Sequence, residues 1–201
     1  MAVSTLSPTL ERDLQRAVAA AHHEEERQRP SMNQLGLWLF FLSESFLFGA
    51  LLSARFYLAG TDRPHVNQLL GLAITAILLV SSLTAYRSEV SIAHGDRKAF
   101  LRYLLATIAL GVIFAGGVAY EWSTAEFSRS EPYGAAFFSM TGLHASHVIS
   151  GVAMLAMVYF LGVRGRFSAD SHWGVEAVIK YWHFVDVVWV FFYPALYLVK
   201  L

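Results

Sequence analysis

Long stretches of this sequence carry almost no charge, and their lengths match the thickness of a lipid bilayer. Arg63 and Arg87 enclose 23 residues without a charge, and Lys180 and Lys200 enclose 19 residues whose only charge is Asp186. A helix needs roughly 20 predominantly apolar residues to cross the hydrocarbon layer. Five such stretches occur, which predicts an all-α integral membrane bundle of five transmembrane helices. The predicted spans are 34–58, 67–86, 101–121, 135–162 and 177–199.

The composition agrees with a membrane protein and excludes several other classes. Hydrophobic residues make up 56% of the chain and charged residues only 15%, whereas charged residues are about a quarter of a soluble domain. The formal net charge is zero, so nothing indicates nucleic-acid binding. The chain has no cysteine, which excludes disulfides, thiolate metal sites and cysteine nucleophiles.

A polar N-terminal tail at residues 1–33 precedes the transmembrane domain at 34–201. Within the tail, residues 10–29 favour a helix, and Pro30 is expected to end it. With five spans, eleven lysines and arginines lie on the amino-terminal side of the membrane and four lie on the other side. The side richer in these residues stays in the cytoplasm. We therefore expect a cytoplasmic N-terminus and an outward-facing C-terminus.

Five polar residues within the spans are candidates for a buried, proton-related site: Glu44, His144, His147, His183 and Asp186. A carboxyl group at the depth of Glu44 stays protonated, finds a partner or lies beside water. The residues alone leave a functional role and a packing role for Glu44 equally open. Likewise His183 and Asp186 share one helix face, where they can meet the same partner.

The histidines of the fourth span allow two interpretations. His144 and His147 lie one turn apart, and paired imidazoles can ligate haem or a metal. They can also bond a neighbouring helix. Haem ligation between helices needs histidines on two helices, and only His183 lies outside the pair, so we favour the interhelical bond and expect no metal and no catalytic residue. Specifically, we expect His147 or His183 to hydrogen-bond a group on another helix.

Lipid headgroups are the expected ligands at the ends of two spans. Glu121 and Trp122 close the third span, and aromatic residues in such positions lie at the headgroup level. Arg164 and Arg166 follow the fourth span on its cytoplasmic side, where they can hold a lipid phosphate. The alternative is that these arginines only set the topology.

Several of these segments resemble subunit III of the haem–copper terminal oxidases, the cytochrome c and quinol oxidases. The resemblance covers about residues 31–200; it includes Thr141–Gly151 (TGLHASHVISG) and is most specific in Tyr181–Trp189 (YWHFVDVVW). Further similar segments are the Ser-Glu pair of the first span, Ala119–Trp122 (AYEW), Tyr133–Phe138 (YGAAFF) and His172–Ala177 (HWGVEA).

The resemblance implies a non-catalytic subunit of a bacterial inner-membrane oxidase that reduces oxygen to water and translocates protons. Such a subunit packs on the catalytic subunit I, supports its stability and proton uptake, and binds phospholipid. It carries no cofactor, and haem and copper belong to partner subunits. Many members have two further N-terminal helices that form one wall of a lipid-filled cleft, so this chain looks like the five-helix version. Cytochrome c and quinol both remain open as electron donors.

Three other functions remain open from the sequence. One is an accessory subunit of nitric oxide reductase, which is built on the same fold. Another is a small proton-coupled transporter that uses Glu44, His147 and Asp186 as a relay. The third is a membrane cytochrome with haem on the histidines.

Overall fold

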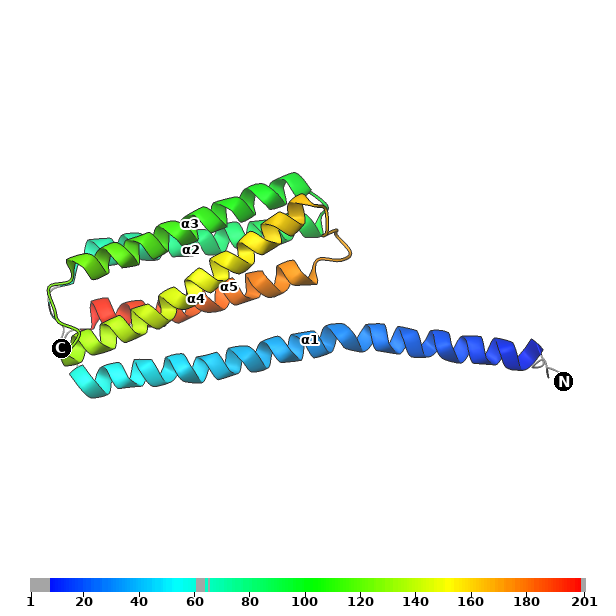
Figure 1. Ribbon diagram of the computed structural model, residues 1–201, viewed down its shortest axis with the longest axis horizontal. Helices are drawn as coiled ribbons and strands as arrows, with labels where there is room; N and C mark the ends of the chain where they lie inside the picture. Colours follow the sequence, from blue (N-terminus) through cyan, green and yellow to red (C-terminus); the bar gives the residue numbers. More distant parts are fainter. Residues whose placement is uncertain (1–7, 61–63, 65, 200–201) are drawn as a thin grey trace, which may run out of the picture. The chain divides into compact units, whose positions relative to one another are not determined.

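The computed structural model describes residues 8–60, 64 and 66–199, which are almost entirely helical. The only β pairing among them is an isolated bridge between Ser168 and Ser171. The predicted all-α class is therefore confirmed. The elements, shown in Figure 1, are α1 (Pro8–Ala59), α2 (Gln68–Ala93), α3 (Arg97–Thr124), α4 (Pro132–Val163), α5 (Trp173–Tyr193) and a short π-helical segment, η1 (Pro194–Leu198).

The chain divides into two compact units, Met1–Ser43 and Glu44–Leu201. In the first unit, helix α1 continues through Pro30, so the helix end predicted at this residue is wrong. A proline inside a helix removes one backbone hydrogen bond and crowds the preceding turn, at a cost of about 3 kcal/mol. Long helices tolerate such a residue by bending or kinking locally. The candidate site residues discussed below belong to the second unit.

Helices α2 to α5 form the core of the second unit, with contacts between α2 and α3, α3 and α4, α4 and α5, and α2 and α5. Figure 1 shows the α2–α3 turn and the α4–α5 loop at one end of these helices and the α3–α4 connection at the other. Glycines with positive φ, Gly95 (78°) and Gly165 (74°), end α2 and α4. The side chain of Asp96 then caps α3 by accepting from Ala99 N at 2.9 Å.

Tryptophans of α5 bond hydroxyl groups of α2. Trp182 Nε1 donates to Ser81 Oγ at 3.0 Å, and Trp189 Nε1 donates to Thr75 Oγ1 at 2.9 Å. The later tryptophan of α5 bonds the earlier hydroxyl of α2, so the two helices are antiparallel. Both indoles are buried, and a buried indole N–H normally requires an acceptor. These two bonds therefore set the register of α5 against α2.

Trp182 also depends on two glycines of neighbouring helices. A Cβ added to Gly111 of α3 would lie 2.6 Å from Trp182 Cη2, and one added to Gly151 of α4 would lie 2.8 Å from Trp182 Cε3. Real atoms do not approach so closely. Small residues at these positions let α3 and α4 approach the indole from two sides, as small residues commonly do between membrane helices.

The outward faces of α2, α3 and α4 are strongly apolar. Leu83 is 63% exposed, Ile113 53%, Ile149 60% and Phe160 64%. Patches of this kind are rare on soluble monomers and indicate contact with lipid or another protein. Among the described residues, four segments are long and apolar enough to cross a membrane: Met32–Ala59 in α1, and the whole of α2, α3 and α4.

The helices extend beyond several of the predicted spans. The prediction placed the end of the second span at residue 86, before the charge of Arg87, yet α2 continues to Ala93. A charged residue marks where a chain leaves the hydrocarbon layer, whereas a helix ends where its backbone bonding ends. Helix α5 is the one predicted span outside the four apolar segments. Its charged residues, Glu176, Lys180 and Asp186, lower its apolar character.

Candidate functional site

The most distinctive polar contact in the second unit joins Glu44 of α1 to His147 of α4. Glu44 Oε2 lies 3.2 Å from His147 Nε2, and the two side chains are only 19% and 15% exposed. His147 Nδ1 lies 2.8 Å from the carbonyl oxygen of Leu143, which can only accept. Nδ1 therefore carries a hydrogen. It follows that a second proton lies between Oε2 and Nε2, because two acceptors would otherwise face each other.

Aromatic and hydroxyl groups surround this pair. The Phe48 ring lies edge-on to the His147 ring, with 4.9 Å between their centroids. On the other side, Tyr181 Oη donates to the backbone oxygen of His147 at 3.1 Å and lies 2.7 Å from Ser150 Oγ. The pair is thus held between α1, α4 and α5, with a short hydroxyl chain beside it.

His144, one turn before His147, faces a different environment. It is fully buried, and its Nε2 donates to the carbonyl oxygen of Val185 at 3.1 Å, while its Nδ1 has no hydrogen-bond partner in the described part of the chain. The rings of Phe114 and Trp189 lie beside it, at centroid distances of 5.6 and 4.7 Å. His144 therefore ties α4 to α5 and does not join the Glu44–His147 pair.

A second polar group connects α2 and α5. His183 Nδ1 lies 2.7 Å from Ser82 Oγ. Asp186, one turn further along α5, is 4% exposed, and neither carboxyl oxygen meets a hydrogen-bond partner among the described residues. The side chain of Ser82 lies beside it. Both His147 and His183 thus bond a side chain on another helix, which confirms that prediction.

The structure separates residues that a transporter relay would bring together. His147 bonds Glu44, whereas Asp186 lies beside Ser82, and no hydrogen bond joins Asp186 to His147 or Glu44 within the described segments. In the described ranges 8–60, 64 and 66–199, no three histidine, aspartate or glutamate side chains are arranged so that they could hold a metal ion. The geometry therefore offers two polar groups on different sides of the bundle.

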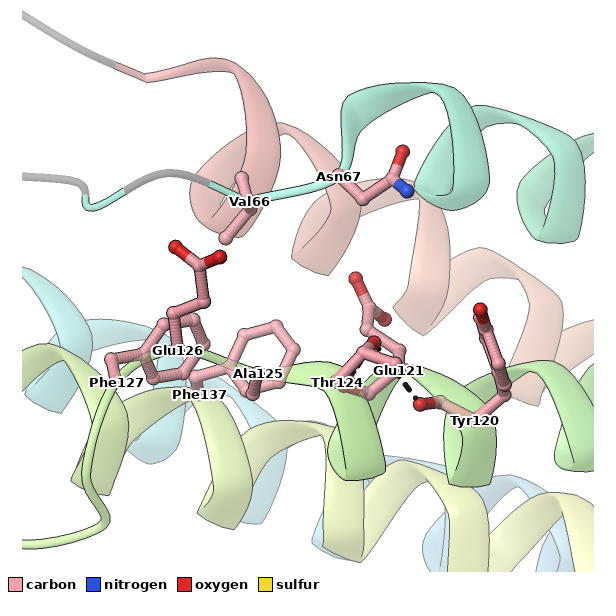
Figure 2. A pocket seen from close by; sticks show the side chains of 9 residues that line it. All are labelled: Val66, Asn67, Tyr120, Glu121, Thr124, Ala125, Glu126, Phe127 and Phe137. Carbon is pink, nitrogen blue, oxygen red and sulfur yellow. Dashed lines mark hydrogen bonds between the residues drawn. The ribbon is translucent and has the colours of Figure 1, made fainter.

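The four residues predicted to bind lipid headgroups fall into two kinds. Arg164 and Arg166 are exposed just after α4. Glu121 is 5% exposed, and its Oε2 accepts from Tyr197 Oη at 2.6 Å. Trp122 is half-buried and donates from Nε1 to Thr141 Oγ1 at 3.0 Å. Figure 2 shows that Glu121 lines a pocket beside the end of α3.

Sequence reasoning missed several polar residues that build these contacts. Ser82, Ser150 and Tyr181 were hidden because single hydroxyls are common in membrane helices and carry no spacing signal. Arg55 was counted only toward topology, yet it is fully buried. Its Nη1 donates to the carbonyl oxygen of Gly60 at 2.9 Å, and its guanidinium lies 4.8 Å from the centre of the Tyr133 ring.

Comparison with known proteins identifies one family. The sequence model described as cytochrome c oxidase subunit III matches residues 6–200. A cytochrome c oxidase subunit 3 of Thermostichus vulcanus is 33% identical over 190 residues, covering 90% of this chain and 93% of the relative. Proteins of the same name from Dugong dugon and Bos taurus are 35% and 36% identical over 176 residues, covering 81% of this chain and 67% of each relative.

Proposed function

The chain belongs to the cytochrome c oxidase subunit III family, and we propose that it packs against the haem- and copper-bearing subunit I of a respiratory oxidase. It is a multi-pass membrane protein and a non-catalytic subunit of the oxidase complex. The observation that carries this conclusion is the match over residues 6–200, which includes every helix described above. Because the family and the relatives carry the name cytochrome c oxidase, we propose cytochrome c as the electron donor of the complex.

We propose five membrane spans, with α5 as the fifth. Helix α5 has 21 residues, which at 1.5 Å per residue is about 32 Å, enough for a hydrocarbon layer of about 30 Å. It packs against α2 and α4, which are both long and apolar enough to span. Its buried ionisable residue, Asp186, faces the bundle, as ionisable residues in membrane helices usually do.

The proposed orientation places the N-terminus in the cytoplasm of a bacterium and the C-terminus outside. The α2–α3 turn and the α4–α5 loop lie at one end of the helices (Figure 1). Arg97 and Lys98 follow the first connection, and Arg164 and Arg166 lie in the second. Basic residues of this density favour the cytoplasmic side. The exposed Arg164 and Arg166 are then available to lipid phosphates.

The Glu44–His147 pair is the part of this chain that we propose supports proton uptake by the catalytic subunit. It holds a proton between two titratable groups inside a membrane span, beside the hydroxyls of Tyr181 and Ser150. Intramembrane ionisable residues are costly and commonly belong to proton pathways. His183 and Asp186 form the second proposed proton-related group, and His144 is proposed as a structural link.

The other functions considered from the sequence have less support. A transporter relay through Glu44, His147 and Asp186 would need these groups to communicate, yet Asp186 lies beside Ser82 and shares no hydrogen bond with the other two among the described residues. Haem ligation would compete with the bonds that His144 and His147 make to Val185 and Glu44. The family match does not favour a nitric oxide reductase subunit.

Co-purification tests the proposed assembly. The chain would be tagged at its C-terminus, extracted in a mild detergent and purified from membranes of its own organism. We expect a large subunit with haem absorbance and bound copper to co-purify with the chain in a constant molar ratio. The chain should show no haem band once it is separated from that subunit. Recovery of the tagged chain alone, with oxidase activity left complete in the unbound fraction, would contradict the proposal.

A further inference from the structure

One ring nitrogen of His183, on α5, is left unsatisfied by the described part of the chain. Its Nδ1 lies 2.7 Å from Ser82 Oγ of α2. Its Nε2 has no hydrogen-bond partner among the described residues and is accessible at the surface of this half-buried side chain. Asp186, one turn further along α5, does not bond it, because neither carboxyl oxygen meets a partner within the described segments. Nε2 therefore faces whatever surrounds α2 and α5.

The bond to Ser82 decides which nitrogen of His183 carries the hydrogen. A serine hydroxyl in a helix often donates to a carbonyl of the preceding turn, as Ser81 does to Leu78 O at 2.6 Å. Ser82 makes no such bond, and the imidazole is its one hydrogen-bond partner in the described ranges. The hydroxyl therefore donates to Nδ1, which leaves the single hydrogen of the neutral ring on Nε2. The result is an accessible N–H donor without an acceptor.

This donor lies near the middle of the membrane. His183 is the eleventh of the 21 residues of α5, so at 1.5 Å per residue it is about 15 Å from either end. Ser82 lies about 17 Å before the end of α2 by the same rise, and α2 is long and apolar enough to span. The hydrocarbon layer is about 30 Å thick, so both helices place the contact close to its centre. The depth along α5 rests on the fifth span proposed above.

Lipid cannot satisfy an N–H at this depth. Acyl chains have no acceptor, and the oxygens of the headgroup region lie about 15 Å away. The histidine side chain is too short to reach them, unlike lysine or arginine. The other imidazole N–H groups of the spans are matched, since His144 donates to Val185 O and His147 donates to Leu143 O. An unpaired donor in hydrocarbon is costly, so the acceptor must come from protein.

The surface around His183 suits a membrane helix. Leu79 and Tyr86 lie one turn to either side of Ser82, and Val187 lies one turn after His183; all three are exposed. Membrane helices associate by close packing and by interhelical hydrogen bonds. An exposed apolar strip with one donor in its middle offers both. A second copy of this chain would present the same donor and the same apolar residues, so it matches this strip poorly.

We infer that the α2–α5 face around His183 docks a transmembrane helix of another oxidase subunit, and that this helix presents a hydroxyl, amide or carboxyl oxygen to Nε2–H. The inference rests on the proposed function, because it names the surface and the chemistry by which this chain joins its complex. Packing against Leu79, Tyr86 and Val187 supplies the contact area, and the hydrogen bond fixes the register of the partner helix.

The test compares variants in the whole purified oxidase complex. His183→Asn keeps a polar group near Nδ1 but loses the donor at Nε2, whereas His183→Gln carries an N–H at about the position of Nε2. Dissociation of the chain is timed after dilution in detergent. We expect the asparagine variant to dissociate about tenfold faster, the factor for losing roughly one hydrogen bond. The glutamine variant should dissociate at close to the wild-type rate. His94→Asn is the matched control, because His94 is exposed and its ring bonds Val90 O of its own helix.

Ser82→Ala separates the interface from packing inside the chain. It removes the same internal bond to Nδ1 and leaves the N–H of His183 in place, so dissociation should stay close to the wild-type rate. Equal acceleration by His183→Asn and Ser82→Ala would overturn the inference, because the internal bond would then account for the whole effect. Equal acceleration by the asparagine and glutamine variants would overturn it too.

Photo-cross-linking identifies the occupant directly. A benzophenone amino acid takes the place of the exposed Val187, and the complex is irradiated in its own membranes. The expected product joins this chain to a membrane helix of another subunit, with an oxygen-bearing side chain within one turn of the attachment. A product with a second copy of this chain, or no protein product, overturns the inference. A complete complex with either result overturns the docking face alone, whereas a chain that never joins the oxidase overturns the proposed function.

Discussion

His147 faces Glu44 with Nε2, 3.2 Å from Oε2, because its Nδ1 is committed to the carbonyl oxygen of Leu143 at 2.8 Å. Only one of the two nitrogens is therefore left for the carboxyl group. The shared proton allows either a neutral acid and imidazole or a carboxylate and imidazolium. Separated charges are costly at membrane depth, so we expect the neutral form.

Replacing Glu44 distinguishes the two forms. Glu44→Gln should keep assembly and the thermal midpoint of the complex, because an amide N–H can donate to neutral Nε2. Glu44→Leu removes the donor and should cost about 1–2 kcal/mol. Differential scanning calorimetry of the purified complex measures both. If the glutamine variant loses as much stability as the leucine variant, the native pair is ionic and the neutral assignment is wrong.

The contact between Gly151 and Trp182 predicts a steric effect. Gly151→Ala should destabilise the complex by about 1–3 kcal/mol, because the new methyl group would lie 2.8 Å from Trp182 Cε3 and force one helix to move. Gly116→Ala is the control, since a Cβ there meets nothing within 4 Å. Thermal midpoints are again the readout. Equal effects of the two changes would show that the change in stability comes from helix propensity and not from packing against Trp182.

The bond from Trp189 to Thr75 should also be measurable. Thr75→Val leaves the buried indole N–H without its acceptor, which we expect to cost about 1–3 kcal/mol. Ser123→Ala is a suitable control because Ser123 is exposed and bonds only its own helix. A double-mutant cycle with Trp189→Phe isolates the pair. A coupling energy near zero would mean that the hydrogen bond adds nothing to the stability that packing already provides.

Arg97 at the start of α3 bonds the C-terminal carbonyl groups of α4. Nε donates to Gly162 O at 3.0 Å, and Nη2 donates to Val163 O. Arg97→Ala should lower stability by about 1–2 kcal/mol, through lost hydrogen bonds and a lost cation at a helix C-terminus. Lys98→Ala, which removes an exposed basic residue next to Arg97, should change little. Proteolysis of the α4–α5 loop in intact membranes offers an independent readout, since loosening α4 should speed cleavage.

The isolated chain is expected to be short-lived. Its outward faces are apolar and its helices carry polar groups that pack best with neighbours, so partner subunits should stabilise it by mass action. A pulse–chase experiment in membranes with and without the other oxidase subunits measures the half-life. Equal half-lives in the two strains would argue against a role as a subunit.

Most of the helical architecture could be predicted from the sequence, whereas side-chain pairing could not. Charge-free stretches located α2, α3 and α4 because membrane length and hydropathy are local properties. Glu44 and Asp186 could be placed within their helices, but the rotation of each helix about its axis could not be predicted. That rotation decides that His147 meets Glu44 and that Asp186 lies beside Ser82.

The bonds between α2 and α5 have a consequence for biosynthesis. Thr75 and Ser81 are translated about a hundred residues before the indoles that bond them, and until then each hydroxyl has only a carbonyl of its own helix, Gly71 O or Leu78 O. The last helix to leave the ribosome therefore completes the hydrogen bonding of one of the first. A chain interrupted before α5 would leave both hydroxyls of α2 without the indole donors that complete their hydrogen bonding.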